Sequence, residues 1–173
     1  MNTANKLTLA RVVMIPAFML VLYLGIPGAN YWALAIFALA SATDWLDGYI
    51  ARKYNQVTDF GKFMDPLADK CLVTAAMLWF VEVGQMPAWA LLLVIVREFA
   101  ISGLRMNAAT TGRVIAAGWS GKVKTASTMV GLCAMMALPG IDILNWVVII
   151  MIVATTLYSG VEYFVQNWNC LWD

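Results

Sequence analysis

Four aspartates form two pairs at helical spacing in the middle of the sequence. Asp44 and Asp47 are three residues apart, and Asp65 and Asp69 are four residues apart. On a helix, both spacings bring the two carboxylates of a pair onto one face. A short polar stretch, Lys53–Phe60, separates the pairs, and strongly apolar sequence flanks them on both sides. The pattern therefore predicts two helix ends, joined by a polar loop, that each present two carboxylates.

A metal site with oxygen ligands is the chemistry that such a cluster favours. Carboxylates clustered beside apolar segments repel one another and are costly to bury, so a cation must offset them. The chain has no histidine and its three cysteines are scattered, so the available ligands are oxygen atoms. Such ligands suit Mg²⁺, Mn²⁺ or Ca²⁺ and disfavour zinc. The alternative is a helix rim whose acids are neutralised by Arg52, Lys62 and Lys70, but four acids at this spacing favour the metal.

Small residues surround the acids. Gly48 and Ala51 fall on the face of the first pair, and Gly61 lies one turn before Asp65. A glycine on the acid-bearing face leaves room for a ligand to approach the backbone. Small residues also let membrane helices pack closely, and this alternative stays open for each glycine taken alone.

Membrane-spanning helices are predicted to carry these residues. Of the 173 residues, 62% are hydrophobic and 12% are charged, whereas a soluble domain carries about a quarter charged residues. The apolar runs are near-continuous rather than striped, which is typical of membrane spans. The expected fold class is an all-α integral membrane protein, with six transmembrane helices in a single domain, 1–173. The spans are predicted at about 7–24, 31–49, 63–83, 88–104, 125–138 and 144–165, and the fifth has an open start that could precede Lys122.

Basic residues are concentrated on one side of the predicted spans. Every Lys and Arg except Arg97 lies near the N-terminus, in 52–70 or in 105–124. The loops that follow the first, third and fifth spans contain none. The positive-inside rule therefore puts both termini and both polar loops in the cytoplasm. The four acids then lie at the cytoplasmic ends of the second and third spans.

The pattern D-x2-D-G-x2-A-R-x8-G-x3-D-x3-D is complete from Asp44 to Asp69 and resembles the signature of the CDP-alcohol phosphatidyltransferases. Members of this family transfer a phosphatidyl or similar group from a CDP-linked donor to an alcohol and release CMP. The resemblance implies two divalent cations, Mg²⁺ or Mn²⁺, held mainly by Asp44, Asp47 and Asp65. It implies that Asp69, also a candidate ligand, is the catalytic base. The CDP contacts that it implies are Gly48, Ala51, Arg52 and Gly61.

The acceptor is expected to bind in a second, basic region. Arg105, Arg113, Lys122 and Lys124 lie between the end of the fourth predicted span and the start of the fifth. Because Arg and Lys bind phosphate well, these cations favour an acceptor that carries a phosphate. The alternative is a plain positive-inside bias or attraction to anionic lipids.

Arg97 lies well inside the fourth predicted span, where a charge needs a partner. Glu98 is adjacent in sequence but points to a different face of the helix, so it is not an assured partner.

Four further pieces resemble the family members whose acceptor is sn-glycerol 3-phosphate and whose donor is CDP-diacylglycerol. They are Asn5-Lys-Leu-Thr8-x2-Arg11, Arg97-Glu98, Ser102-Gly-Leu-Arg105 and Gly121-Lys-Val-Lys-Thr125. Many such relatives have Gln where this chain has Thr128. Asn5, Thr8 and Arg11 are candidates for further contacts to the donor, and a capped and anchored first helix is the alternative.

Other functions remain open at this point. Inositol phosphate, serine or a second phosphatidylglycerol could replace glycerol 3-phosphate as the acceptor. A divalent-cation transporter is the alternative from another class, but its acids should lie at mid-membrane along a pore rather than at one edge. The resemblance also implies a homodimer in the inner membrane of a bacterial cell, with no nucleic-acid partner.

Overall fold

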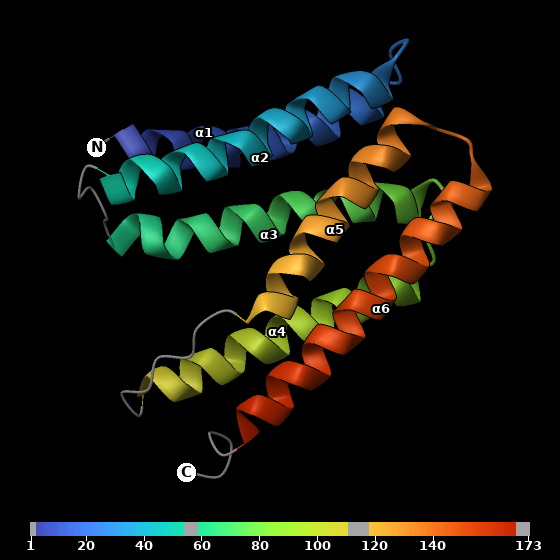
Figure 1. Cartoon of the computed structure of the whole chain (residues 1–173). Helices are drawn as coiled ribbons and strands as arrows, with labels where there is room; N and C mark the ends of the chain where they lie inside the picture. Colours follow the sequence, from blue (N-terminus) through green and yellow to red (C-terminus); the bar gives the residue numbers. More distant parts are fainter. Residues whose placement is uncertain (1–2, 54–58, 111–117, 169–173) are drawn as a thin grey trace. The chain divides into compact units, whose positions relative to one another are not determined.

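Six α-helices and no strand make up the part of the chain that the computed structural model describes, which is residues 3–53, 59–110 and 118–168 (Figure 1). Within these ranges, side-chain surroundings are described for all residues except 3–5, 44–53, 59–63, 65–66 and 109–110. The all-helical part of the predicted fold class is confirmed. The helices are α1 (Thr3–Tyr23), α2 (Ala29–Lys53), α3 (Asp59–Glu82), α4 (Ala88–Thr110), α5 (Trp119–Ala137) and α6 (Asp142–Gln166).

Each predicted span coincides with one of these helices, but several helices extend further than the apolar run. Helix α3 begins at Asp59 rather than near Phe63, and α5 begins at Trp119, before Lys122. Hydropathy marks where a segment stops being apolar, whereas a helix can continue through polar residues as long as its backbone hydrogen bonds are made. The polar connection between α2 and α3 is therefore shorter than the sequence predicts.

Glycines with left-handed backbone follow three of the described helices. Gly25 and Gly28 follow α1 with φ of 58° and 75°, Gly84 follows α3 with 74°, and Gly140 follows α5 with 86°. Side chains other than glycine rarely adopt such φ values, so these turns depend on glycine.

The described residues form two compact units. The first contains α1, α2 and α3 as far as Phe80, with the short segment Met136–Pro139. In it, α1 packs along α2 (Figure 1). The fully buried rings of Phe18 and Phe37 join the two helices, with centroids 6.1 Å apart.

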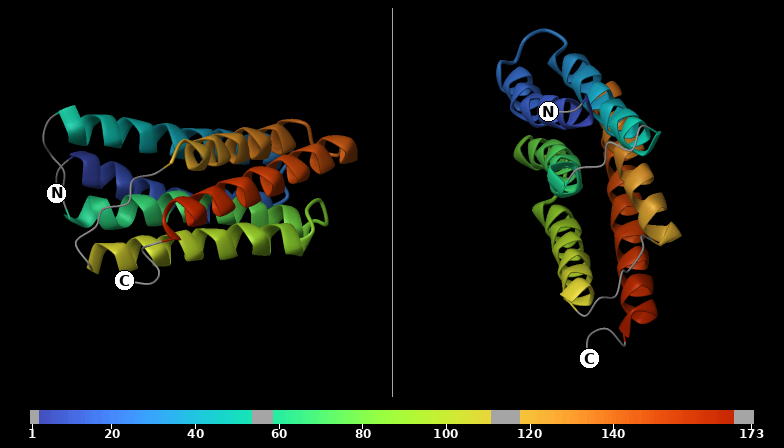
Figure 2. Two further views of the ribbon diagram at one scale, coloured as in Figure 1. Left: turned by 60° about the horizontal axis from the view of Figure 1, so that its bottom comes forward. Right: turned by 90° about the vertical axis from the view of Figure 1, so that its left-hand side faces the viewer.

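The second unit contains α4, α5 as far as Met135, and α6. Helices α4 and α6 lie side by side in both views of Figure 2. Helices α5 and α6 approach closely at Gly131, where an added Cβ would lie 2.7 Å from Cγ1 of Val148. A small residue at such a point allows two membrane helices to come together.

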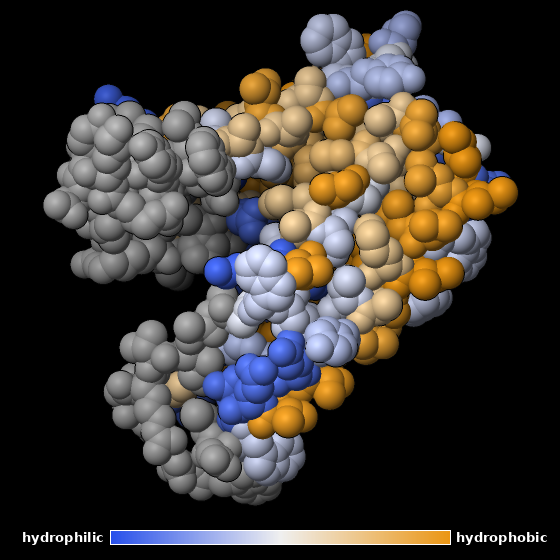
Figure 3. Space-filling view, in the orientation of Figure 1, coloured by the Kyte–Doolittle hydropathy of each residue, from blue (hydrophilic) through white to orange (hydrophobic). Residues whose placement is uncertain are grey.

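Large apolar side chains cover much of the surface. Figure 3 shows hydrophobic side chains along α6 from its N-terminal end, and hydrophilic ones nearer its C-terminal end. On α4, an exposed apolar face recurs at helical spacing in Trp89, Leu92, Val96 and Phe99. Among the described residues, the segments Lys6–Tyr23 and Asp142–Gln166 are long and apolar enough to cross a bilayer. Such a surface suits lipid rather than water and marks a membrane protein.

Candidate active site

The two aspartate pairs lie on the helix ends that the polar connection joins. Asp44 and Asp47 lie in the last three turns of α2, and Asp65 and Asp69 lie in the first three turns of α3. The predicted helical spacing within each pair is thus confirmed for the backbone. The side chain of Asp69 is half-buried, and those of the other three acids lie outside the described residues.

The predicted CDP contacts lie on the same two helix ends. Gly48, Ala51 and Arg52 belong to the last turns of α2, and Gly61 belongs to the first turn of α3 rather than to a loop. Their surroundings are outside the described residues, so these roles stay predictions.

The donor set fits a hard divalent cation. The chain offers four carboxylates on these two helix ends and no histidine, and carboxylate oxygens are the ligands that Mg²⁺ and Mn²⁺ prefer. The described side chains alone contain no cluster of three His, Cys, Asp or Glu residues, and they do not include Asp44, Asp47 and Asp65.

Helix α1 is anchored to α2 close to the first pair of acids. Arg11 is fully buried, and its Nε donates a hydrogen bond to the backbone carbonyl of Ala40 at 3.2 Å. Ala40 lies one turn before Asp44, so Arg11 fixes α1 against the segment that leads to that residue. The structure thus shows an anchoring contact for Arg11, and a donor contact from it stays a prediction.

The other two N-terminal candidates lie on α1 as well. Thr8 is also buried, on the same helix. Asn5 lies inside α1, which begins at Thr3, and its side chain is outside the described residues. A CDP contact from either residue stays a prediction.

The predicted acceptor cations have different surroundings. Arg105 on α4 is exposed at its surface, and its Nε donates a hydrogen bond to the hydroxyl oxygen of Tyr163 on α6 at 2.8 Å. Its guanidinium carbon lies 5.3 Å from the centre of the Tyr163 ring. Lys122 is exposed near the start of α5, and Arg113 lies outside the described residues.

Lys124 is buried and belongs to an ionic network with Arg97 and Glu98. Lys124 Nζ donates to Glu98 Oε1 at 2.7 Å, and Arg97 Nη1 donates to the same oxygen at 2.9 Å. The sequence left the partner of Arg97 open, and the structure shows that Glu98 is a partner. Successive Cβ atoms do point to different faces of a helix, but these two side chains are long enough for their ends to meet beside α5.

Small residues make room for the Arg97 side chain in this network. Its Nη2 donates to Ser159 Oγ on α6 at 3.0 Å. An added Cβ would lie 3.6 Å from Nη2 at Gly121 and 3.4 Å from Cγ at Gly160. Arg97 thus lies among α4, α5 and α6 and makes a polar contact with α6 at Ser159. Glu98 extends the network to α5 through Lys124.

Sequence reasoning missed the residues of α6 that contact these arginines. The buried face of α6 begins with Asn145, is apolar from Val148 to Ile152 and then carries Thr156, Ser159 and Tyr163. These three hydroxyl residues recur at spacings of three and four, which puts them on one face of an otherwise apolar helix. Because buried hydroxyls need hydrogen-bond partners, that spacing could have indicated polar contacts with a neighbouring helix.

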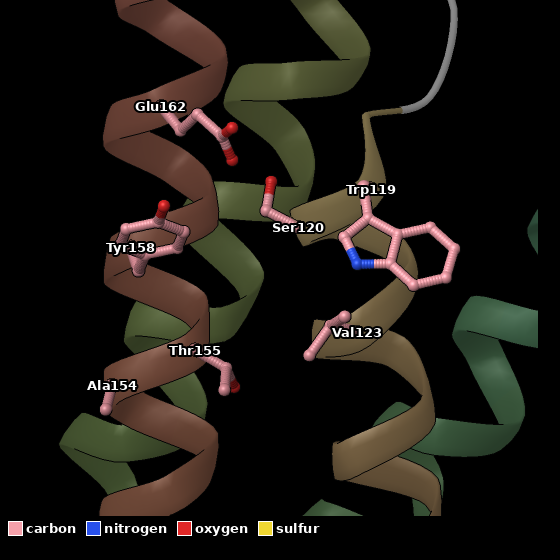
Figure 4. A pocket seen from close by; sticks show the side chains of 7 residues that line it. All are labelled: Trp119, Ser120, Val123, Ala154, Thr155, Tyr158 and Glu162. Atoms are coloured by element: carbon pink, nitrogen blue, oxygen red, sulfur yellow. The ribbon is translucent and has the colours of Figure 1, made fainter.

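A cavity of about 370 Å³ lies along α5 and α6, and its described lining includes none of the predicted site residues. Figure 4 shows Ser120 and Glu162 directed into it from the two helices. Glu162 Oε1 accepts a hydrogen bond from Gln166 Nε2 at 3.1 Å. Among the described residues, no Lys or Arg lines this cavity. Its lining residues are Trp119, Ser120, Val123, Ala154, Thr155, Tyr158 and Glu162.

Comparison with known proteins agrees with the signature on α2 and α3. Residues 1–158 match the family described as CDP-alcohol phosphatidyltransferase. The CDP-diacylglycerol–glycerol-3-phosphate 3-phosphatidyltransferase of Bacillus subtilis strain 168 is 41% identical, over 98% of this chain and 97% of that protein. The protein of the same name from Escherichia coli K12 is 41% identical, over 94% of this chain and 92% of that protein.

A third relative is named probable phosphatidylglycerophosphate synthase. It comes from Mycobacterium tuberculosis and is 38% identical over 94% of this chain and 79% of its own length. The family match and all three relatives cover most of the chain, including both acid pairs. This chain therefore belongs to the CDP-alcohol phosphatidyltransferase family.

Proposed function

We propose that this protein transfers the phosphatidyl group of CDP-diacylglycerol to sn-glycerol 3-phosphate, giving phosphatidylglycerol phosphate and CMP. The observation that carries the proposal is similarity over nearly the full length. The Bacillus and Escherichia relatives, whose names state this donor and this acceptor, are each 41% identical to the chain. The complete acid signature on two joined helix ends and the basic region on α4 and α5 supply the two kinds of group that the reaction needs.

The proposed topology has six membrane crossings, with the active site at the cytoplasmic ends of α2 and α3 and both termini in the cytoplasm. Its support is that the described helices have 19 to 25 residues, which is close to the roughly 20 residues that a crossing needs. The one-sided distribution of Lys and Arg supports the orientation. A location in the inner membrane of a bacterium, as a homodimer, belongs to the same proposal, and cysteine cross-linking in isolated membranes tests the dimer.

The acids of α2 and α3 hold the metal ions in this proposal. Asp44, Asp47 and Asp65 bind two divalent cations, Mg²⁺ or Mn²⁺, in keeping with a family that generally depends on such ions. When bound, these ions neutralise the pyrophosphate of the donor and stabilise the CMP that leaves. The CDP moiety is bound by the small residues and the arginine of the signature, Gly48, Ala51, Arg52 and Gly61.

Asp69 removes the proton from the acceptor. Its half-buried carboxylate lies one helical turn from Asp65, and it accepts the proton of the attacking hydroxyl. The hydroxyl oxygen forms a bond to the phosphorus of the phosphatidyl group. The bond from that phosphorus to the pyrophosphate bridging oxygen breaks, and CMP departs with that oxygen.

The basic residues bind the phosphate of the acceptor. Arg105 and Lys122 are exposed and can meet a dissolved anion directly. Lys124 would share its ammonium between the phosphate and Glu98, because Glu98 already accepts a hydrogen bond from it. Arg113 completes the proposed set.

A panel of acceptors tests the proposal. The purified protein receives CDP-diacylglycerol, Mg²⁺ and, separately, labelled glycerol 3-phosphate, inositol phosphate, serine or phosphatidylglycerol, and CMP and lipid product are followed together. Lipid product from glycerol 3-phosphate alone is the expected result. Product from another acceptor would overturn the acceptor assignment, and absence of CMP release with every acceptor would overturn the reaction.

A further inference from the structure

We propose that Tyr163 is a positioning residue that orients the guanidinium of Arg105 for the phosphate of the acceptor. The inference rests on the proposed function, since it requires an acceptor that carries a phosphate. Tyr163 lies outside the family signature and near the C-terminal end of α6, so neither the acid pattern nor the basic pattern identifies it.

The ring of Tyr163 is held firmly. It is 5% exposed and packs with Ile101 and Leu104 of α4, with Phe164 beside them. A buried ring packed on a neighbouring helix has few alternative rotamers, so its hydroxyl occupies a defined position at the surface of α4. That hydroxyl accepts the hydrogen bond from Arg105 Nε at 2.8 Å.

The contact determines which edge of the guanidinium meets a ligand. A guanidinium presents its donors in one plane, and an oxyanion can bind bidentately to the edge with Nε or to the edge with both Nη atoms. Tyr163 takes the Nε–H, so the edge with Nη1 and Nη2 is assigned to the phosphate. The contact of the guanidinium with the Tyr163 ring, 5.3 Å from carbon to ring centre, restrains its plane as well.

The contact with Tyr163 preorganises the Arg105 side chain for binding the acceptor. An exposed arginine samples many rotamers and loses that freedom when it binds an anion. Tyr163 restricts the rotamers before the acceptor arrives, so less freedom is lost on binding. Helix α6 makes a similar contact one turn earlier, where Ser159 Oγ accepts a hydrogen bond from Arg97 Nη2 at 3.0 Å.

The substitution Tyr163→Phe tests the role, because it removes the hydroxyl and keeps the ring. We expect the KM for glycerol 3-phosphate to rise about tenfold, which corresponds to about 1.4 kcal/mol, while kcat and the KM for CDP-diacylglycerol change less than about twofold. The matched control is Tyr158→Phe, on the same helix but 68% exposed, which should leave all three constants unchanged. Equal KM values for glycerol 3-phosphate in the Tyr163→Phe variant and the unaltered protein would overturn the proposal.

A double-mutant cycle with Arg105→Ala separates positioning from a general loss of structure. If Tyr163 acts through Arg105, Tyr163→Phe should raise the KM no further in the Arg105→Ala background. Additive effects on KM would overturn the positioning role and leave the proposed function intact. An Arg105→Ala variant with an unchanged KM for glycerol 3-phosphate would instead remove Arg105 from the acceptor site, and both proposals for Arg105 would fail together.

Discussion

Lys124 on α5 donates a hydrogen bond of 2.7 Å to Glu98 on α4, and both side chains are largely removed from solvent, with 5% and 22% of their area exposed. Arg97 shares the same carboxylate oxygen. One acid therefore serves two cations from different helices. Because ions buried without partners are costly, the contact links the positions of α4 and α5 to each other.

Glu98→Gln should destabilise the protein, since it leaves Lys124 and Arg97 without their counter-charge. Breaking a buried pair costs about 3–5 kcal/mol, and the partial exposure of Glu98 puts the expected loss near the lower end of that range. Thermal unfolding in detergent measures the loss. Asp142→Asn, at an exposed position in the first turn of α6, is the control and should cost less than about 1 kcal/mol. Similar losses in the two variants would contradict the importance of this network.

Asp69→Asn should retain donor binding and lose turnover. An amide of nearly the same shape cannot accept the hydroxyl proton, and general-base catalysis contributes about 10²–10⁴-fold. Binding of CDP-diacylglycerol and kcat should be measured on the same preparation. Unchanged turnover would remove Asp69 from the role of base, and a large loss of donor binding would indicate a ligand instead.

Chelation should abolish the reaction reversibly. EDTA treatment followed by dialysis should stop CMP release, and Mg²⁺ or Mn²⁺ should restore it better than Zn²⁺, because the proposed ligands are oxygen atoms only. Asp47→Asn should raise the Mg²⁺ concentration that gives half-maximal rate, whereas Asp142→Asn should not. Full activity after exhaustive chelation would contradict the metal site.

Gly131→Ala should destabilise the contact between α5 and α6. The added methyl would lie 2.7 Å from Val148 Cγ1 and 3.1 Å from Met151 Cε, so side chains must move, at a typical cost of about 1–3 kcal/mol. The matched control is Gly103→Ala on α4, where nothing lies within 4 Å of the new Cβ. Adding Val148→Ala to Gly131→Ala should recover part of the unfolding midpoint, and no recovery would mean that the close approach is not the cause.

Much of the fold was predictable because the six helices follow apolar runs of span length. The helix ends were less predictable, as the start of α3 at Asp59 shows, since polar residues extend a helix without changing hydropathy. The backbone spacing of the acid pairs followed from helical periodicity alone. The partners of the basic residues did not, because contacts such as Arg105 with Tyr163 join positions that are distant in sequence. The pairing of Arg97 with Glu98 depended on side-chain length rather than on the direction of Cβ.

The glycine turns after α1, α3 and α5 limit what the molecule displays on the side of the membrane opposite the cytoplasm in the proposed topology. Only residues 24–28, 83–87 and 138–141 connect the helices on that side, and their left-handed glycines leave little freedom to enlarge them by substitution. Such short, uncharged connections offer proteases on that side of the membrane almost no cleavage site. Purification tags and reporter fusions should therefore be attached at the chain termini.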